Sequence, residues 1–129
     1  MKKNKKVKTG EVFLAHNKYM HNPKNKFHIC INEKMYLLIN SKPSTFNCEI
    51  TIDECSFLTH TSYINCTVIR TEPINEFQII KKEELPLVVI ERIIQKIEVV
   101  PTISPIQKKQ ALKDLNECLA TIQNEVKNV

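Results

Sequence analysis

The densest run of residues able to perform acid–base chemistry is Thr59-His60-Thr61-Ser62-Tyr63, which follows the acidic pair Asp53-Glu54. A histidine two residues from a serine on a loop can act as a general base or contact a phosphate. The alternative interpretation is that His60 and Ser62 satisfy backbone groups of their own loop. The spacing does not define a Ser-His-Asp triad, because such triads are recognised by geometry and not by sequence.

A second pair of candidate residues lies in the segment 26–31 (KFHICI). Lys26 and His28 alternate with apolar residues, which predicts a strand whose basic side chains lie on the face opposite the apolar ones. There they would present positive charge at a binding surface, or would simply form an exposed strand face. Just before them, segment 16–26 is rich in asparagine and lysine and predicts a loop in which Lys18 and Lys24 could contact an anion.

Small hydroxyl residues and one lysine, Ser41-Lys42-Pro43-Ser44-Thr45, directly follow an apolar segment. This position suits contact with a phosphate or a sugar, so Ser41 and Lys42 are further candidates. The same residue types are ordinary turn formers, which is the alternative. The four histidines are scattered and lack carboxylate partners in sequence, so we expect no metal site.

Composition excludes several classes of protein. With Gly10 as its only glycine, the chain cannot form a glycine-rich phosphate loop or a dinucleotide-binding fingerprint, and we expect no cofactor. The five cysteines are odd in number and lack Cys-x-x-Cys spacing, which indicates reduced thiols. No apolar stretch follows the N-terminal lysines, and no run approaches the roughly 20 apolar residues of a membrane span. We therefore expect a cytoplasmic protein without a membrane association.

Charge divides the chain into a basic front and a mildly acidic back. The net charge of +5 is the balance of +8 over residues 1–48 and −3 over residues 49–129. A basic front can steer an anionic partner such as RNA. We expect residues 1–9 to form a disordered, basic tail, and the alternative to a role in binding is that its lysines only improve solubility.

Hydrophobic patterning predicts an α+β protein with a β-rich front and a helical back. Alternating or continuous apolar segments predict strands, and they cover residues 11–15, 27–31, 35–39, 48–52, 63–71 and 77–80. Helical spacing begins near Glu83, and Ser104-Pro105 begins a second helix that runs to about residue 124. We expect one domain over residues 10–129, with a small antiparallel curled sheet or barrel (10–82) followed by two C-terminal helices (83–129).

The last predicted helix carries a narrow apolar seam of leucine, isoleucine and valine residues. Its members recur at steps of three and four residues, and they are Leu112, Leu115, Leu119, Ile122 and Val126. Such a seam either belongs to the core of the domain or forms a surface for a protein partner.

Three segments together resemble small bacterial proteins grouped with the PemK/MazF-like toxin superfamily. They are the opening 8–14 (KTGEVFL), the strand pair 27–40 that ends in Leu38-Ile39-Asn40, and the later 57–64 (FLTHTSYI) with Arg70. A serine–proline pair before a basic helix, Ile103-Ser104-Pro105, is similar as well. The resemblance covers roughly residues 8–113.

The resemblance implies an SH3-like β-barrel with appended helices, often dimeric, in a family whose toxins cut single-stranded RNA without metal. A basic residue and a small hydroxyl residue serve there in acid–base and phosphate-binding roles, which Lys26 and Ser41 match. The chain departs from the toxins at Lys26-Phe27-His28-Ile29, where they carry Lys-x-Arg-Pro, so that His28 stands in place of the arginine.

Two functions are consistent with these features. The first is an RNA-directed, toxin-like protein of a bacterial toxin–antitoxin or defence system, acting as a metal-independent endoribonuclease. Its predicted catalytic residues are Lys26, His28, Ser41, His60 and Ser62, and its predicted RNA contacts are Lys18, Lys24, Lys42, Tyr63 and Arg70. Its partners would be RNA, an antitoxin and a second copy of the chain. The second is a non-catalytic module that binds a protein or a nucleic acid.

Overall fold

The computed structural model describes residues 6–127, with side chains described through residue 125. This part of the chain contains a β-rich front and two helices, as the sequence predicts. The elements are β1 (Glu11–Asn17), β2 (Lys24–Asn32), β3 (Met35–Asn40), β4 (Asn47–Ile50), β5 (Ser62–Arg70), the short 3-10 helix η1 (Ile74–Glu76), β6 (Ile79–Glu84), α1 (Leu87–Val99) and α2 (Pro105–Lys127).

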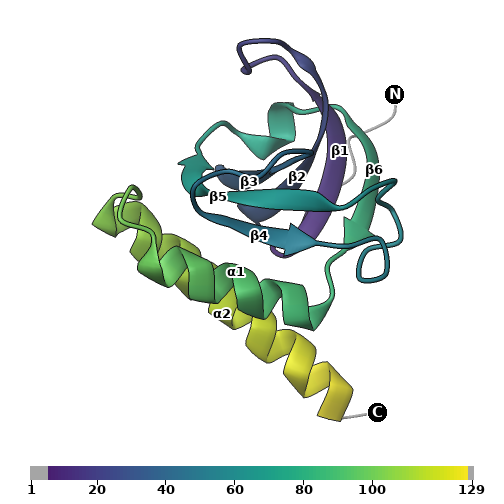
Figure 1. Cartoon of the computed structure of the whole chain (residues 1–129). Helices are drawn as coiled ribbons and strands as arrows, with labels where there is room; N and C mark the ends of the chain where they lie inside the picture. Colours follow the sequence, from purple (N-terminus) through teal and green to yellow (C-terminus); the bar gives the residue numbers. More distant parts are fainter. Residues whose placement is uncertain (1–5, 128–129) are drawn as a thin grey trace.

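The six strands form one antiparallel sheet in the order β4-β5-β3-β2-β1-β6, which confirms the α+β class. β4 and β6 are edge strands, so the sheet is open and the predicted closed barrel is not confirmed. The helices α1 and α2 lie side by side along one side of the curved sheet (Figure 1). As its run of apolar residues predicts, β3 (MYLLI) is central and buried on both faces.

The first helix begins later than the sequence predicts. Glu83 and Glu84 belong to β6 and pair with Val12 and Glu11 of β1, where they extend the sheet. Proline disfavours a helical conformation at the residue before it, so Leu85 cannot continue a helix into Pro86. Pro86 therefore takes the N-cap position, and α1 begins at Leu87.

The second helix begins where the sequence predicts. The backbone N–H of Gln107 donates to the Ser104 hydroxyl at 3.3 Å, and that of Lys108 donates to the Ser104 carbonyl at 2.9 Å. The apolar seam of α2 packs into the domain's own core through Leu115, which is fully buried, and its half-buried neighbours. The side chain of Val126, which we assigned to the same seam, lies outside the described residues. Within residues 6–127, no helix has the length and apolar character needed to cross a membrane.

Apolar cores cover both faces of the sheet. The larger core joins one face to the helices, through residues such as Ile29 and Leu37 of the sheet and Ile93 and Ile97 of α1. The smaller core lies on the opposite face, where Ile74 of η1 and Phe77 pack against Phe13 and Tyr36. The sequence did not reveal this second core. Residues 72–76 read as a short connection, and Phe77 was assigned to a predicted strand over residues 77–80, whereas β6 begins at Ile79 and Phe77 packs on the sheet.

Part of the predicted N-terminal tail belongs to the folded body. The hydroxyl of Thr9 donates to the Ile31 carbonyl at 2.8 Å, and the backbone N–H of Lys8 donates to the Glu11 carboxylate at 2.7 Å. The tail that we predicted over residues 1–9 is therefore too long at its C-terminal end. Residues 1–5 of that prediction lie outside the described residues.

Gly10 holds the start of β1 against α2. Its φ of +85° lies in the left-handed region, and a Cβ built there would stand 2.8 Å from the Cys118 sulfur and 3.3 Å from the Ile90 side chain. Gly10→Ala should therefore lower the free energy of unfolding by about 2–3 kcal/mol, which chemical denaturation would measure.

A double variant separates the two causes of this loss. Cys118→Ala removes the sulfur, so the combination Gly10→Ala/Cys118→Ala should lose less stability than the sum of the two single changes. The strained φ remains in the double variant, which should still be less stable than Cys118→Ala alone. If Gly10→Ala were as stable as the wild type, the positive φ and the close packing would both be in error.

Candidate functional site

A cleft of about 260 Å³ lies where the ends of β2 and β3 meet the loop that precedes β5. Its walls come from Leu14 of β1, residues 24–27 of β2, residues 39–41 at the end of β3, the loop residues 57–60 and Ser62 of β5. Antiparallel pairing of β2 with β3, and of β3 with β5, brings these segments together from distant parts of the sequence. The volume is below the range of about 300–1,000 Å³ typical of small-molecule pockets, so it suits part of a larger ligand.

This cleft brings together five of the residues that the sequence singled out. They are Lys24, Lys26, Ser41, His60 and Ser62. Four of them belong to the predicted catalytic group: Lys26 comes from β2, Ser62 from the start of β5, and Ser41 and His60 from the loops that follow β3 and precede β5.

Lys26 is half-buried and donates a hydrogen bond from its Nζ to the Asn40 side-chain oxygen at 2.5 Å. The register of β2 against β3, in which His28 lies opposite Leu38, places Lys26 and Asn40 next along the same face. Burial lowers the pKa of the Lys26 ammonium, and the nearby charge of Lys24 lowers it further. Lys26 is therefore a cation that gives up its proton more readily than an exposed lysine.

His60 is held by contacts within its own loop. Its Nδ1 lies 3.0 Å from the Thr61 carbonyl oxygen, which can only accept, so Nδ1 carries a proton. The Ser62 hydroxyl, 3.3 Å from the same nitrogen, donates to the His60 carbonyl at 3.1 Å. In neutral His60 the lone pair is therefore on Nε2, which makes no hydrogen bond within residues 6–127. Ser62 itself is only 4% exposed, so its hydroxyl orients the loop more than it offers a reactive group to a ligand.

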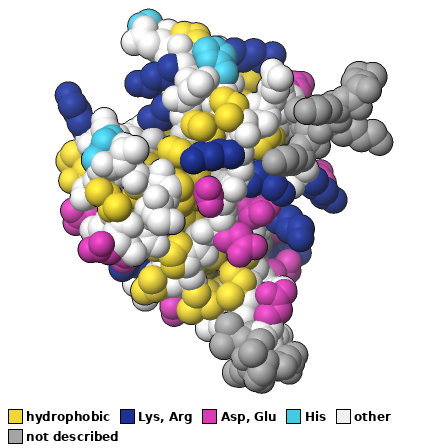
Figure 2. Space-filling model, turned by 90° about the vertical axis from the view of Figure 1, so that its right-hand side faces the viewer, with side chains coloured by type: hydrophobic (Ala, Val, Ile, Leu, Met, Phe, Trp, Pro, Cys, Tyr) yellow, Lys and Arg dark blue, Asp and Glu magenta, His cyan; other side chains and the backbone are white. Residues whose placement is uncertain are grey.

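The charge of the cleft is positive. Its lining contains two lysines and a histidine but no aspartate or glutamate. Three larger cavities in the described part of the chain each include at least one carboxylate. Figure 2 shows histidine and basic side chains at the end of the molecule where the β1–β2 loop lies, further basic side chains across the middle, and most of the visible acidic side chains toward the other half.

His28 does not lie at a binding surface, so the prediction that it occupies an exposed strand face is wrong. It is fully buried in the smaller core, where its ring stacks on Phe13 with a centroid distance of 4.6 Å. Its Nδ1 lies 3.3 Å from the Phe13 carbonyl, and its Nε2 accepts from the Asn17 amide at 3.1 Å. Burial lowers the pKa of His28 to about 4, so it is neutral at pH 7. The prediction failed because Phe77 and its neighbours cover the strand face that was expected to be exposed.

The four other predicted RNA contacts do not line the cleft. The Arg70 guanidinium donates to Glu72 and to the Tyr19 carbonyl, both at 3.3 Å, and so holds the β1–β2 loop. On that same loop, the Lys18 ammonium lies 5.3 Å from the centre of the Tyr19 ring. Lys42 is exposed just beyond Ser41. Tyr63 pairs with Asn40 across β5 and β3 and therefore lies on the sheet beside the cleft.

Sequence reasoning missed two features of the cleft. One is Asn40, whose side chain receives the Lys26 hydrogen bond. The other is an aromatic pair, Phe27 and Phe57, whose ring centres are 5.1 Å apart and whose side chains form part of the apolar wall. Asn40 ends the Leu38-Ile39-Asn40 segment, which could have flagged it. Phe57 opens the segment 57–64 of the same resemblance, but its contact with Phe27 could not be read from the sequence, because the two residues are distant in the chain.

The cleft combines a cation, an imidazole and hydroxyl groups. Within the described residues, no three His, Cys, Asp or Glu side chains gather to hold a metal ion. An imidazole with a free Nε2 can take a proton from a hydroxyl, and an ammonium can stabilise a phosphate or protonate a leaving oxygen. This set of groups is suited to a phosphodiester.

The sequence matches no protein-family model, and a comparison with curated proteins finds no match either.

Proposed function

We propose that the protein binds single-stranded RNA through this cleft and cleaves it without a metal ion. The observation that carries the proposal is the lining itself, which brings Lys24, Lys26 and His60 together in the absence of any carboxylate. A cation-lined surface attracts a phosphate backbone. The aromatic wall of Phe27 and Phe57 gives a base an apolar surface to contact.

In this proposal His60 is the general base and Lys26 the cation. Nε2 of His60 takes the proton of a 2′-hydroxyl, whose oxygen attacks the adjacent phosphorus while the bond to the 5′ oxygen breaks. Lys26 stabilises the charge on the phosphate, and its lowered pKa favours transfer of its proton to the departing oxygen. In this mechanism Ser41, which lines the cleft, donates a hydrogen bond to the phosphate, and Ser62 positions the His60 loop.

The proposal extends to the setting in which such an activity would work. An RNA-cutting protein of this kind would act in the cytoplasm, as a toxin restrained by an antitoxin or as part of a defence system. The likeness to the PemK/MazF-like superfamily supports this reading, with the open sheet as a variant of the SH3-like barrel and a homodimer as the expected assembly.

A second candidate is an RNA-binding module without catalytic activity. The observation in its favour is that the polar groups satisfy one another, with Lys26 bonded to Asn40 and Ser62 bonded to the His60 carbonyl. Such a cleft would bind a phosphate without reorganising for chemistry. Binding and cleavage must therefore be measured separately.

Binding to a fluorescein-labelled single-stranded RNA should weaken steeply with salt, as measured by fluorescence anisotropy. Each phosphate contact on a single strand contributes about 0.7 to the slope of log affinity against log salt concentration. Lys24→Gln and Lys26→Gln should each reduce the magnitude of that slope by about 0.7 and weaken binding at low salt.

The matched control is Lys109→Gln, an exposed lysine of α2 away from the cleft, which should leave the slope unchanged. Cleavage of the same RNA, followed on a denaturing gel, should persist in the presence of a chelator. Binding without cleavage would favour the second candidate. A wild-type protein that binds no RNA at low salt would contradict both.

A further inference from the structure

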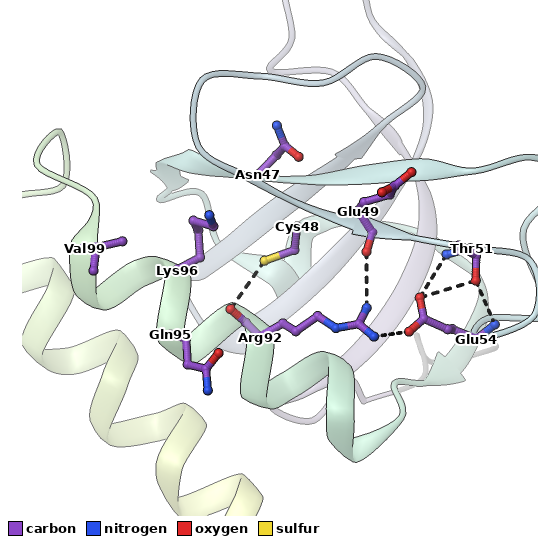
Figure 3. A pocket seen from close by; sticks show the side chains of 9 residues that line it. All are labelled: Asn47, Cys48, Glu49, Thr51, Glu54, Arg92, Gln95, Lys96 and Val99. Carbon is purple, nitrogen blue, oxygen red and sulfur yellow. Dashed lines mark hydrogen bonds and ion pairs between the residues drawn. The ribbon is translucent and has the colours of Figure 1, made fainter.

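A second cavity lies away from the RNA cleft, in a groove between the edge strand β4 and helix α1. Its volume is about 790 Å³, and its lining includes Asn47, Glu49, Glu54, Arg92 and Lys96 (Figure 3). β4 forms one wall and α1 the other, and Cys48 points from β4 toward the helix. The groove is thus bounded by a strand whose outer side has no neighbouring strand.

The backbone groups of Asn47 and Glu49 point to this free edge. The N–H of Cys66 donates to the Phe46 carbonyl at 2.8 Å, so in this antiparallel pair the hydrogen-bonded residues of β4 alternate from Phe46 to Cys48 and Ile50. Asn47 and Glu49 fall between them and direct their N–H and C=O groups away from β5. A strand edge of this kind is a template for one more strand.

The side chain of Arg92 forms a hydrogen bond with the backbone at this free edge of β4. From α1, its Nη1 donates to the Glu49 carbonyl at 3.3 Å, and its Nη2 forms an ion pair with Glu54 (Figure 3). The contact confirms independently that the Glu49 carbonyl points outward. The Arg92 N–H stands where the N–H of an added strand would stand, so the guanidinium occupies the edge that a bound peptide would pair with.

The positive charge of Lys96 on the helix wall of the groove favours peptides that carry a carboxylate. Glu54 neutralises Arg92, whereas Lys96, one turn farther along α1, makes no ion pair within the described residues and points toward β4 (Figure 3). The Glu49 side chain points away from the helix, so its charge is not directed at Lys96. A carboxylate on an added strand would meet Lys96 at this wall.

We propose that the groove between β4 and α1 binds an extended peptide with an acidic side chain, which pairs with the free edge of β4 as an added strand. Its backbone bonds to Asn47 and Glu49, where it displaces the Arg92 N–H from the Glu49 carbonyl, and its carboxylate contacts Lys96. The partner is thus a protein with an extended acidic segment. The proposal does not depend on the RNA cleft, which lies on other residues.

The probe is a library of random peptides displayed on phage and selected on the full chain. Enriched peptides should carry Asp or Glu. When synthesised and titrated into ¹⁵N-labelled protein, they should shift the amide signals of Asn47 and Glu49. Lys96→Glu should weaken the binding of these peptides about tenfold, whereas Lys109→Glu, on the exposed face of α2, should not.

Two further changes test strand addition itself. Asn47→Pro removes an outward-facing N–H without touching the β5 pairing, and it should abolish binding while circular dichroism and the melting temperature confirm the fold. Two peptides are compared, one N-methylated at the odd-numbered amides and one at the even-numbered amides. Only one of the two should lose binding, because only alternate residues of a strand direct their N–H groups to β4. Failure to enrich any peptide, equal binding of both methylated forms, or acidic peptides that bind Lys96→Glu as tightly as the wild type would each overturn the proposal.

Discussion

Replacing His60 with alanine is expected to lower the rate constant of RNA cleavage by about 10²–10⁴-fold, the usual contribution of a general base. The reason is geometric: Nδ1 is held by the Thr61 carbonyl, so Nε2 alone is free to take a proton in the cleft. The affinity for RNA should change far less, because His60 acts in this mechanism as a base and not as a charge. Single-turnover cleavage and anisotropy with the same RNA measure the two effects.

Two matched variants make this result specific. His60→Gln keeps an N–H that can donate to Thr61 but cannot take a proton, so it should lose nearly as much activity as the alanine variant. His21→Ala removes an exposed histidine from the β1–β2 loop and should retain full activity. If His60→Gln cleaved RNA as fast as the wild type, His60 would not be the base.

The stability of the protein should fall between pH 7 and pH 4 because of His28. Its pKa is about 4 in the folded state, against about 6.5 in an unfolded chain, since burial disfavours the charged ring. The folded state therefore binds fewer protons, and this stability is complete above about pH 6.5 and declines as the pH falls toward 4. The expected loss is about 2 kcal/mol at pH 5 and about 3 kcal/mol at pH 4.

Carboxylates also titrate below pH 5, so the effect of His28 is measured as a difference between the wild type and His28→Gln. For each protein, the change in the free energy of unfolding between pH 7 and pH 5 is determined. His28→Gln can still donate to the Phe13 carbonyl and accept from Asn17, yet it carries no titrating ring. The wild type should lose about 2 kcal/mol more than His28→Gln between pH 7 and pH 5 in urea denaturation. His21→Gln, at an exposed position, should follow the wild type. Parallel curves for wild type and His28→Gln would show that His28 is not a buried neutral residue.

The contrast between His60 and His28 illustrates what local sequence patterns can predict. Both histidines were candidates for chemistry on the same grounds, a polar residue near hydroxyls or lysines. His60 lies in the cleft because its loop has no partner strand to bury it. His28 and Ile29 lie on opposite faces of β2, as predicted. The face that His28 shares with Lys26 is covered by Phe77 at His28, whereas it is open to the cleft at Lys26.

The sequence alone determined the features that depend on neighbouring residues. These are the capped start of α2 at Ser104-Pro105, the apolar central strand β3 and the division into a β-rich front and a helical back. Each arises from short-range physics, such as a hydroxyl that bonds a nearby N–H, a proline that bars a preceding helical residue, or the spacing of apolar side chains.

Only the tertiary structure decided which of the candidate side chains meet. Pairing of β3 with both β2 and β5 places Lys26 and Asn40 beside the His60 loop, although these residues are far apart in the chain. The same long-range packing buried His28 and directed Arg70 toward Glu72. Convergence and burial depend on contacts between distant segments, and a one-dimensional pattern does not carry that information.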